Sequence, residues 1–337
     1  MKFGLQIYPW RRWPDLRAIA EVALVAEQCG FDAVALPDHV VAPAGGAAQS
    51  LGSVCPDVHL VSAHIGALTS RIRLLLYAAV IPYRPVIQQA KAIATLDQLC
   101  GGRLVVVAGT GWCQEEFDAL GLPFAERGPI TDEYLRAMIA LWTEDVPSFD
   151  GRYASFGPVR FAPTCRQQPH VPIWIAGSGK GPKRRLTEYG SGWAPMAGDL
   201  RSLAADIASA RRELLAAGRH PDDIEFSFGF AFGEPDSALA QALAHVGGSP
   251  VSTASTSAQH TIEQVAEHQL AGLTELIVSF AWQDPADLCR RVEWFADNII
   301  REMTNESPPT HVSAGMCSTT SDGYTHTANP GRQRRSP

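Results

Sequence analysis

The feature that most restricts the fold is a regular alternation of short apolar runs with longer, amphipathic segments. The runs are apolar throughout and do not alternate between apolar and polar side chains, which is typical of strands buried on both faces of a parallel sheet. The eight expected strands lie at residues 3–7, 33–36, 72–81, 104–108, 172–177, 192–196, 225–232 and 275–280.

Most of these runs are followed by a segment with helical periodicity. The expected helices lie near residues 14–29, 57–69, 85–99, 200–217, 262–270 and 285–302. A strand followed by a helix, repeated eight times, predicts an α/β protein with a closed (β/α)8 TIM barrel. The alternative is an open, doubly wound sheet, which typically has a glycine fingerprint after its first strand. Residues 6–10 contain no glycine, so the barrel is favoured.

Two stretches interrupt the alternation. Residues 149–161 contain the turn signals Asp150-Gly151 and Gly157-Pro158, and we expect a small β-hairpin inserted before the fifth barrel strand. The last stretch is rich in Ser, Thr, Pro and Gly and has no periodicity, as is typical of disordered segments. The expected organisation is therefore a barrel domain over residues 1–303 and a disordered tail over residues 304–337.

Composition excludes several classes of protein. With 28 Lys and Arg against 35 Asp and Glu, the net charge of −7 disfavours a nucleic-acid partner. The apolar runs are shorter than the roughly 20 residues that cross a bilayer, and no leader peptide precedes the first strand. We therefore expect a cytoplasmic protein without a membrane partner. The seven cysteines include no Cys-x-x-Cys pair, so reduced thiols are expected in place of disulfides or a zinc site.

In a barrel, the active site lies where the strands end and the following loops begin. Asp38 and His39 directly follow the second expected strand. Because imidazole titrates near neutrality, His39 is the best candidate for a general acid or base. Asp38 would either orient the imidazole or begin a turn. The alternative for His39 is a capping or packing role in a long loop.

A second candidate site is the glycine-rich loop after the fifth strand. Its backbone N–H groups are unobstructed, and a helix is expected to open at Pro182, so the loop suits a phosphate. It is not a P-loop, because Gly181 and not Ser or Thr follows Lys180. An ordinary flexible turn is the alternative. The residues of the candidate loop are Ala176, Gly177, Ser178, Gly179 and Lys180, with further cations at Lys183, Arg184 and Arg185.

Other chemistries have less support. His59 and His64 are too far apart to share one helical face, and no His-x-His follows the first strand, so no metal site is expected. No Gly-x-Ser-x-Gly nucleophile elbow is present, and Cys113 has no evident base partner. Five aromatic residues at expected strand ends could wall a flat ligand, and buried packing is the alternative for each of them. They are Tyr8, Trp10, Tyr77, Trp112 and Trp193.

A series of short motifs follows in order through the middle of the chain. They are Arg84-Pro85, Lys91, Ala94-Thr95-Leu96-Asp97, Gly101-Gly102-Arg103-Leu104, Gly109-Thr110-Gly111-Trp112, Glu116-Phe117, Arg127-Gly128, Asp132-Glu133-Tyr134, Leu141-Trp142, Phe149-Asp150-Gly151, Pro172-Ile173-Trp174-Ile175 and Gly192-Trp193. Together they resemble the luciferase-like monooxygenase superfamily, and more narrowly its branch of oxidoreductases that use the deazaflavin coenzyme F420. The resemblance covers roughly residues 1–303.

The resemblance implies a (β/α)8 barrel of the bacterial luciferase type, often dimeric, with a flavin or deazaflavin at the carboxyl ends of the strands. The ring would lean on a bulge in the third strand, at Ala78 and Ala79. The cofactor would also contact Gly109, Thr110 and Gly111, and its phosphate would meet the loop at residues 176–180. His39, next to Asp38, would lie near the reactive ring carbon.

Two departures from the family pattern affect the functional prediction. Cys100 replaces the usual Ser before Gly-Gly-Arg, and Trp112 stands where sugar-phosphate dehydrogenase relatives have an acidic residue, which disfavours that substrate class. The first hypothesis is an F420-dependent oxidoreductase that transfers a hydride between the deazaflavin C5 and a small organic substrate. The alternatives are an FMN-dependent monooxygenase, supplied with reduced flavin by a partner reductase, and a flavin-binding relative without activity.

Overall fold

The computed structural model describes residues 1–7, 13, 15–41, 56–195, 199–233, 252–253 and 257–304. Eight parallel strands form a ring that the pairing of β8 with β9 closes, which confirms the predicted barrel. The short β10 (Ser252–Thr253) pairs with β9 beside the ring. In ring order the strands are β1 (Lys2–Gln6), β2 (Ala33–Leu36), β3 (Arg73–Val80), β4 (Leu104–Gly109), β7 (Ile173–Ala176), β8 (Gly192–Ala194), β9 (Glu225–Gly233) and β11 (Glu275–Phe280).

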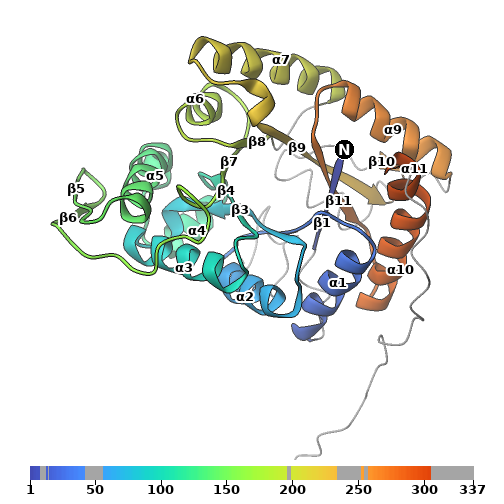
Figure 1. Cartoon of the computed structure of the whole chain (residues 1–337), viewed down its shortest axis with the longest axis horizontal. Coiled ribbons are helices and arrows are strands. Elements are labelled where there is room, and N and C mark those ends of the chain that lie inside the picture. Colours follow the sequence, from blue (N-terminus) through green and yellow to red (C-terminus); the bar gives the residue numbers. More distant parts are fainter. Residues whose placement is uncertain are drawn as a thin grey trace, which may run out of the picture. The chain divides into compact units, whose positions relative to one another are not determined.

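The helices surround this ring (Figure 1). Several begin where a side chain accepts hydrogen bonds from the first free backbone N–H groups. Asp57 caps α2 in this way, and Asp199, Ser257 and Asp284 cap α7, α9 and α10. The helices are α1 (Arg17–Gln28), α2 (Val58–Leu68), α3 (Val86–Leu99), α4 (Gln114–Ala119), α5 (Arg127–Thr143), α6 (Lys180–Glu188), α7 (Leu200–Ala216), α9 (Ala258–Leu270), α10 (Pro285–Phe295) and α11 (Arg301–Thr304). A π-helical turn (Ala296–Ile300) joins the last two, and short 3-10 turns lie at Ile81–Tyr83, Phe124–Glu126 and Pro221–Asp223.

The core has two layers, because each strand presents alternate side chains to the barrel interior and to the helices. The larger layer lies between strands and helices and contains most of the buried aliphatic and Phe side chains. The interior layer consists of Ala33, Ala35, Leu75, Tyr77, Val105, Val107, Trp174, Ala194 and Ile277. The interior is thus filled with side chains, and a ligand is restricted to the ends of the strands.

The expected hairpin is present before the fifth barrel strand. Strands β5 (Phe149–Asp150) and β6 (Ser155–Phe156) pair antiparallel and lie beside α5 (Figure 1). The buried Glu133 carboxylate of α5 accepts the backbone N–H groups of Arg152, Tyr153 and Ala154. The turn of the hairpin is therefore fixed to the barrel by one acidic side chain.

Helix α3 holds the rest of this insertion. The Lys91 ammonium donates to the Ala162 carbonyl, and Gln98 donates to the Thr164 carbonyl at 2.9 Å. The Asp97 carboxylate accepts the backbone N–H groups of residues 166 and 167 at 2.8 and 3.0 Å. The motif residues Lys91 and Asp97 thus stabilise the insertion and lie away from the strand ends.

Some expected boundaries differ from the structure. Helix α6 begins at Lys180, two residues before the expected Pro182, because Gly179 has a φ of +95° and reverses the chain immediately before it. Strand β8 ends at Ala194, and the expected tail lies beyond the described residues except for Thr304. Within the described ranges, no helix combines the length and apolarity needed to cross a membrane.

Candidate active site

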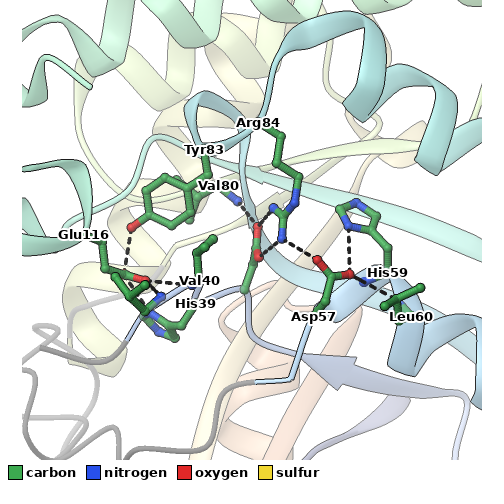
Figure 2. Close-up of polar contacts among 11 residues, drawn as sticks. His39, Val40, Asp57, His59, Leu60, Val80, Tyr83, Arg84 and Glu116 are labelled. Atoms are coloured by element: carbon green, nitrogen blue, oxygen red, sulfur yellow. Dashed lines mark hydrogen bonds and ion pairs between the residues drawn. The ribbon is translucent and has the colours of Figure 1, made fainter. Parts of the chain in front are cut away.

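The centre of the candidate site is a buried ion pair between the ends of β2 and β4. His39, three residues after β2, lies with its Nδ1 2.9 Å from Oε2 of Glu116 in α4. The Glu116 side chain is fully buried, and the imidazole is 9% exposed. The Tyr83 hydroxyl donates to the same Glu116 oxygen at 2.8 Å. Figure 2 shows the His39 and Tyr83 side chains converging on the Glu116 carboxylate.

The Glu116 carboxylate is held in its ionised form. Burial alone would raise its pKa, but hydrogen bonds and the charge of His39, together with bonds from Tyr83 and the Val40 N–H, lower it overall. Its second oxygen accepts the backbone N–H groups of Val40 and Val41 at 2.9 and 3.3 Å. Burial, reinforced by the Glu116 charge, raises the pKa of Tyr83, so this phenol stays protonated and acts as a donor.

This arrangement defines which nitrogen of His39 can react. An ionised Glu116 accepts a hydrogen bond from the Nδ1–H group of His39, so in the neutral ring Nε2 is the nitrogen without a proton. Among the described residues, no hydrogen bond engages Nε2. The Trp112 ring meets the imidazole edge-on, with centroids 6.0 Å apart, and is itself 37% exposed. His39 is therefore a fixed imidazole that can take up or release a proton at Nε2.

Asp38 lies beside His39 in the chain but has different partners. Its carboxylate accepts two hydrogen bonds from the Arg84 guanidinium, at 2.8 and 2.9 Å, and one from the Val80 N–H at 3.0 Å. The residue that orients the imidazole is therefore Glu116, and Asp38 ties the end of β2 to the end of β3.

The end of β3 contains the expected bulge. The register with β4 shifts between Tyr77 and Ala79, so Ala78 is the extra residue, and the Tyr77–Ala78 peptide bond is cis. Ala78 packs at the edge of the barrel interior, whereas Ala79 packs in the layer between strands and helices. Ala78 is thus the bulge residue at the strand ends, and Ala79 faces the other way.

Small residues form a floor next to this bulge. A Cβ atom placed on Gly109 would lie 3.2 Å from the Ala78 Cβ and 3.9 Å from the Ala176 Cβ. Three small residues at the ends of β3, β4 and β7 are therefore neighbours, and a side chain at Gly109 would crowd them. Such a floor suits a flat ring, which is the shape of a flavin or deazaflavin. The residues present thus fit the cofactor that the family resemblance implies.

Gly111 has a different role from Gly109. Its φ is +84°, and a Cβ atom there would lie 2.6 Å from the Phe117 ring and 2.9 Å from a Val80 methyl carbon. The glycine allows α4 to pack tightly over the end of β3, which brings Glu116 toward His39. Thr110, between the two glycines, is half-buried.

The predicted phosphate loop leads from β7 into α6. Gly177 has a φ of +97°, and its carbonyl accepts the Trp193 indole N–H at 2.8 Å, so β8 holds the loop in place. Ser178, Gly179 and Lys180 are exposed. A groove of about 670 Å³ begins at Gly179 and Lys180 and continues between α6 and α7. The loop thus presents backbone N–H groups and one lysine at a helix N-terminus.

The other cations of α6 have acidic partners. Lys183 pairs with Asp206 at 2.8 Å, and both Arg184 and Arg185 pair with Asp132, at 2.5 and 2.6 Å. Arg184 also pairs with Glu188. Within the part of the chain that the structure describes, Lys180 forms no ion pair. The charge available to a phosphate is therefore smaller than the sequence suggested.

Of the five aromatic residues expected to wall a ligand, only Trp112 is both described and exposed at the site. Tyr77 and Trp193 are buried in the core, Tyr8 and Trp10 lie outside the described residues, and Trp112 is exposed beside His39. Cys113 is buried, and burial raises the pKa of its thiol to about 11, which makes it a poor nucleophile. Among the described residues, no cluster of three His, Cys, Asp or Glu side chains could hold a metal ion.

Sequence reasoning did not assign the roles of Glu116, Tyr83 and Arg84. Glu116 is 77 residues from His39 in the chain, and Arg84 is 46 residues from Asp38. Glu116 and Arg84 belong to the motifs of the family resemblance, so their presence was noted. Their partners could not be identified, because only the pairing of β2 with β3 and of β3 with β4 brings the ends of these strands together.

The barrel, the bulge floor and the buried acid–base pair define a class of TIM-barrel proteins that can hold a flat cofactor at the strand ends. The sequence matches the family model of luciferase-like monooxygenases over residues 3–326, and the chain belongs to this family.

Similar sequences include an uncharacterized protein and a monooxygenase. An uncharacterized protein of Mycobacterium tuberculosis is 36% identical over 173 residues, which are 48% of this chain and 60% of the relative. The FMNH(2)-dependent dimethylsulfone monooxygenase of Pseudomonas putida is 28% identical over 207 residues, which are 60% of this chain and 55% of that enzyme. The chain thus spans about 60% of the length of the first relatives it matches.

Solved structures show the same fold. An F420-dependent secondary alcohol dehydrogenase in complex with an F420–acetone adduct superimposes with a TM-score of 0.73. It is 18% identical, and the match covers 89% of this chain and 98% of that one. This likeness shows that the two chains share the barrel fold.

Proposed function

We propose that this protein is an F420-dependent oxidoreductase that transfers a hydride between the deazaflavin and a small organic substrate. The observation that carries the proposal is the buried His39–Glu116 pair, with its Tyr83 donor, beside the floor of small residues. A substrate that loses or gains a hydride at carbon commonly loses or gains a proton on a neighbouring atom. A fixed imidazole with one uncommitted nitrogen provides that proton transfer.

The chain's residues have separate tasks in this proposal. Ala78, Gly109 and Ala176 form the shelf for the ring, and the backbone N–H groups of residues 178–180 bind the phosphate, since that of Gly177 donates to the Ala194 carbonyl. Lys180 and the groove beside it would bind the acidic side chain of the cofactor. The bound deazaflavin supplies the hydride chemistry. His39 accepts or donates the substrate proton at Nε2, and the Glu116 charge stabilises the imidazolium that forms when it accepts.

An FMN-dependent monooxygenase is the second candidate, and the relationship to the Pseudomonas putida enzyme supports it. It would use the same floor and phosphate loop, and it would need reduced flavin from a partner reductase.

Parallel titrations distinguish the two candidates. The purified full-length chain is titrated with F420 and with FMN, each oxidised and reduced under anaerobic conditions. We expect tighter binding of F420 than of FMN. Micromolar binding of FMN without binding of F420 would replace the first candidate by the second, and binding of neither would contradict both.

We also propose that the protein forms a homodimer through α2 and α3. These adjacent helices expose four large apolar side chains, and two of them, Leu60 and Leu99, are 74% and 65% exposed. Exposed apolar side chains that gather on neighbouring helices favour protein–protein contact. Light scattering would show twice the mass of the chain, and Leu60→Glu would shift the protein toward monomers. A wild-type monomer at all concentrations would contradict this proposal.

A further inference from the structure

One arginine connects three segments next to the candidate site. The Arg84 guanidinium forms a bidentate pair with the Asp38 carboxylate, and its NH2 group also donates to Asp57 at 3.2 Å. Asp57 in turn accepts the backbone N–H groups of His59 and Leu60, which are the first free donors of α2. Figure 2 shows the guanidinium next to Asp57, with His59 on its far side. The end of β2, the turn after β3 and the start of α2 are therefore joined by one side chain.

The Asp38 carboxylate also binds the strand that contains the bulge. Asp38 accepts the Val80 N–H at 3.0 Å, and Val80 is two residues after the bulge residue Ala78. On its other side, Asp38 is the chain neighbour of His39. The Asp38–Arg84 pair thus connects the backbone next to His39 with the strand end that carries the floor, while Glu116 orients the imidazole ring itself.

The pair is built for precision. The Asp38 side chain is fully buried, and that of Arg84 is 18% exposed. Two parallel N–H···O bonds fix direction as well as distance, which a lysine at this position would not do. Burial would lower the pKa of Arg84, but hydrogen bonds and charges from Asp38 and Asp57 raise it overall, so the guanidinium stays charged.

We propose that Arg84 and Asp38 are positioning residues, which hold the His39 imidazole and the Ala78 floor at a fixed separation. This inference rests on the proposed function, because it concerns the alignment of the proton-transfer group with the ring. Neither side chain touches the reacting atoms in this role. A misplacement of about 1 Å can lower a rate by about two orders of magnitude, so a small relaxation of this tie has a large effect.

The test compares Arg84→Lys and Arg84→Ala with Arg73→Ala. Arg73 also pairs with a buried carboxylate, that of Glu275, but at the opposite ends of the strands. Arg84→Ala is expected to lower kcat at least tenfold with little change in KM, and added guanidinium ion is expected to restore part of the loss. Arg84→Lys keeps the charge and is expected to lower kcat less. Arg73→Ala is expected to lower stability without a change in kcat.

Two readouts do not depend on the cofactor. Hydrogen–deuterium exchange at the Val80 amide is expected to become at least tenfold faster in Arg84→Lys, and the NMR signals of the His39 imidazole are expected to shift. Arg73→Ala should change neither. Unchanged exchange and unchanged imidazole signals in Arg84→Lys would overturn the inference, even if the wild-type chain bound neither cofactor. If the wild type binds neither cofactor while both signals change, the proposed function fails and the positioning role of Arg84 and Asp38 stands.

The kinetic comparison has its own contradicting outcome. Equal losses of kcat in Arg84→Ala and Arg73→Ala, with no rescue by guanidinium, would show a purely structural role of Arg84 and would overturn the inference.

Discussion

The two ends of the barrel both carry buried charges, but they use them differently. At the amino ends of the strands, Arg73, the first residue of β3, pairs with Glu275, the first residue of β11. Lys2, the first residue of β1, pairs with Glu225, the first residue of β9. At the carboxyl ends, Asp38 is neutralised by Arg84, but within the described part of the chain the His39–Glu116 pair leaves one ring nitrogen without a hydrogen bond. A charge pair whose groups are all matched across strands contributes to stability alone, whereas a pair with one unused nitrogen at the carboxyl ends has the form that the proposed proton transfer requires.

The carboxylates at the two ends also differ in their protonation. Burial raises the pKa of Glu275, and the opposing charge and hydrogen bond of Arg73 do not fully offset it. Glu116 is buried as well, but His39, Tyr83 and backbone donors outweigh the burial and lower its pKa. The number of donors around a buried carboxylate, and not its burial alone, therefore determines which form it takes.

The largest expected effect is the loss of turnover when His39, at the carboxyl ends of the strands, is replaced. His39→Asn removes the titrating ring but keeps a side-chain N–H that can donate to Glu116. We expect turnover of any substrate of the wild type to fall by about 10²- to 10⁴-fold, while cofactor affinity changes only slightly. Steady-state kinetics and cofactor titration measure the two quantities. A variant with wild-type turnover would show that His39 is not the proton-transfer group.

The next effect concerns stability at the amino ends. Arg73→Ala leaves the Glu275 carboxylate buried without its partner, and we expect a loss of about 2–3 kcal/mol in the free energy of unfolding. Because the proposed cofactor site lies at the other side of the barrel, cofactor affinity should not change. Urea unfolding followed by circular dichroism gives the first quantity. An equal loss of cofactor affinity would show that the two ends are coupled.

A smaller effect is expected from a change of pH, which should change the contributions of Glu116 and Glu275 to the free energy of unfolding in opposite directions. The pKa of Glu116 lies below its ordinary value of 4.5, so its stabilising contribution is present above that pH and is lost as the pH falls through the lowered pKa. The pKa of Glu275 lies above 4.5, so its contribution is present below that pH and is lost as the pH rises through the raised pKa.

Glu116→Gln should therefore cost more stability at neutral pH than at acidic pH, and Glu275→Gln should cost more at acidic pH. The difference is about 1.4 kcal/mol for each pH unit by which a pKa is shifted. Urea unfolding at a series of pH values measures it. The same sign of pH dependence in both variants would refute the contrast between the two ends.

The smallest effect concerns the phosphate loop. Lys180→Gln removes one exposed charge at the N-terminus of α6, and we expect cofactor affinity to fall about three- to fivefold, less so at high salt. Arg212→Gln removes an equally exposed charge from α7 and serves as the control. Cofactor titrations at low and high salt compare the two. Equal effects of both substitutions would indicate a general influence of net charge.

The fold was predictable because the strands carry a local signal. Strands buried on both faces need continuous apolar runs, and the eight runs coincide with the eight strands of the ring. The hairpin was predictable for a similar reason, since its turn residues are adjacent in the chain. The start of α6 was predicted two residues late, because the positive φ of Gly179 is a backbone property that the sequence does not specify.

The site was predictable only in part. His39 and the loop at residues 176–180 follow strand ends, which the alternation of runs locates. The partners of these residues are not encoded locally, since Asp132 and Asp206 neutralise α6 from two other helices. Three cations that the sequence offered to a phosphate are thus already neutralised. Charge patterns along one segment do not show which charges remain free after folding.

One consequence follows from the two oxygens of Glu116. One oxygen serves the imidazole and the Tyr83 hydroxyl, and the other accepts the backbone N–H groups of Val40 and Val41. When His39 gains a proton, the charge that this carboxylate must balance changes, and the backbone bound to its other oxygen experiences that change directly. The chain that leaves the site after β2 therefore shares one buried carboxylate with the imidazole, and its backbone hydrogen bonds at Val40 and Val41 depend on the charge balance of that carboxylate.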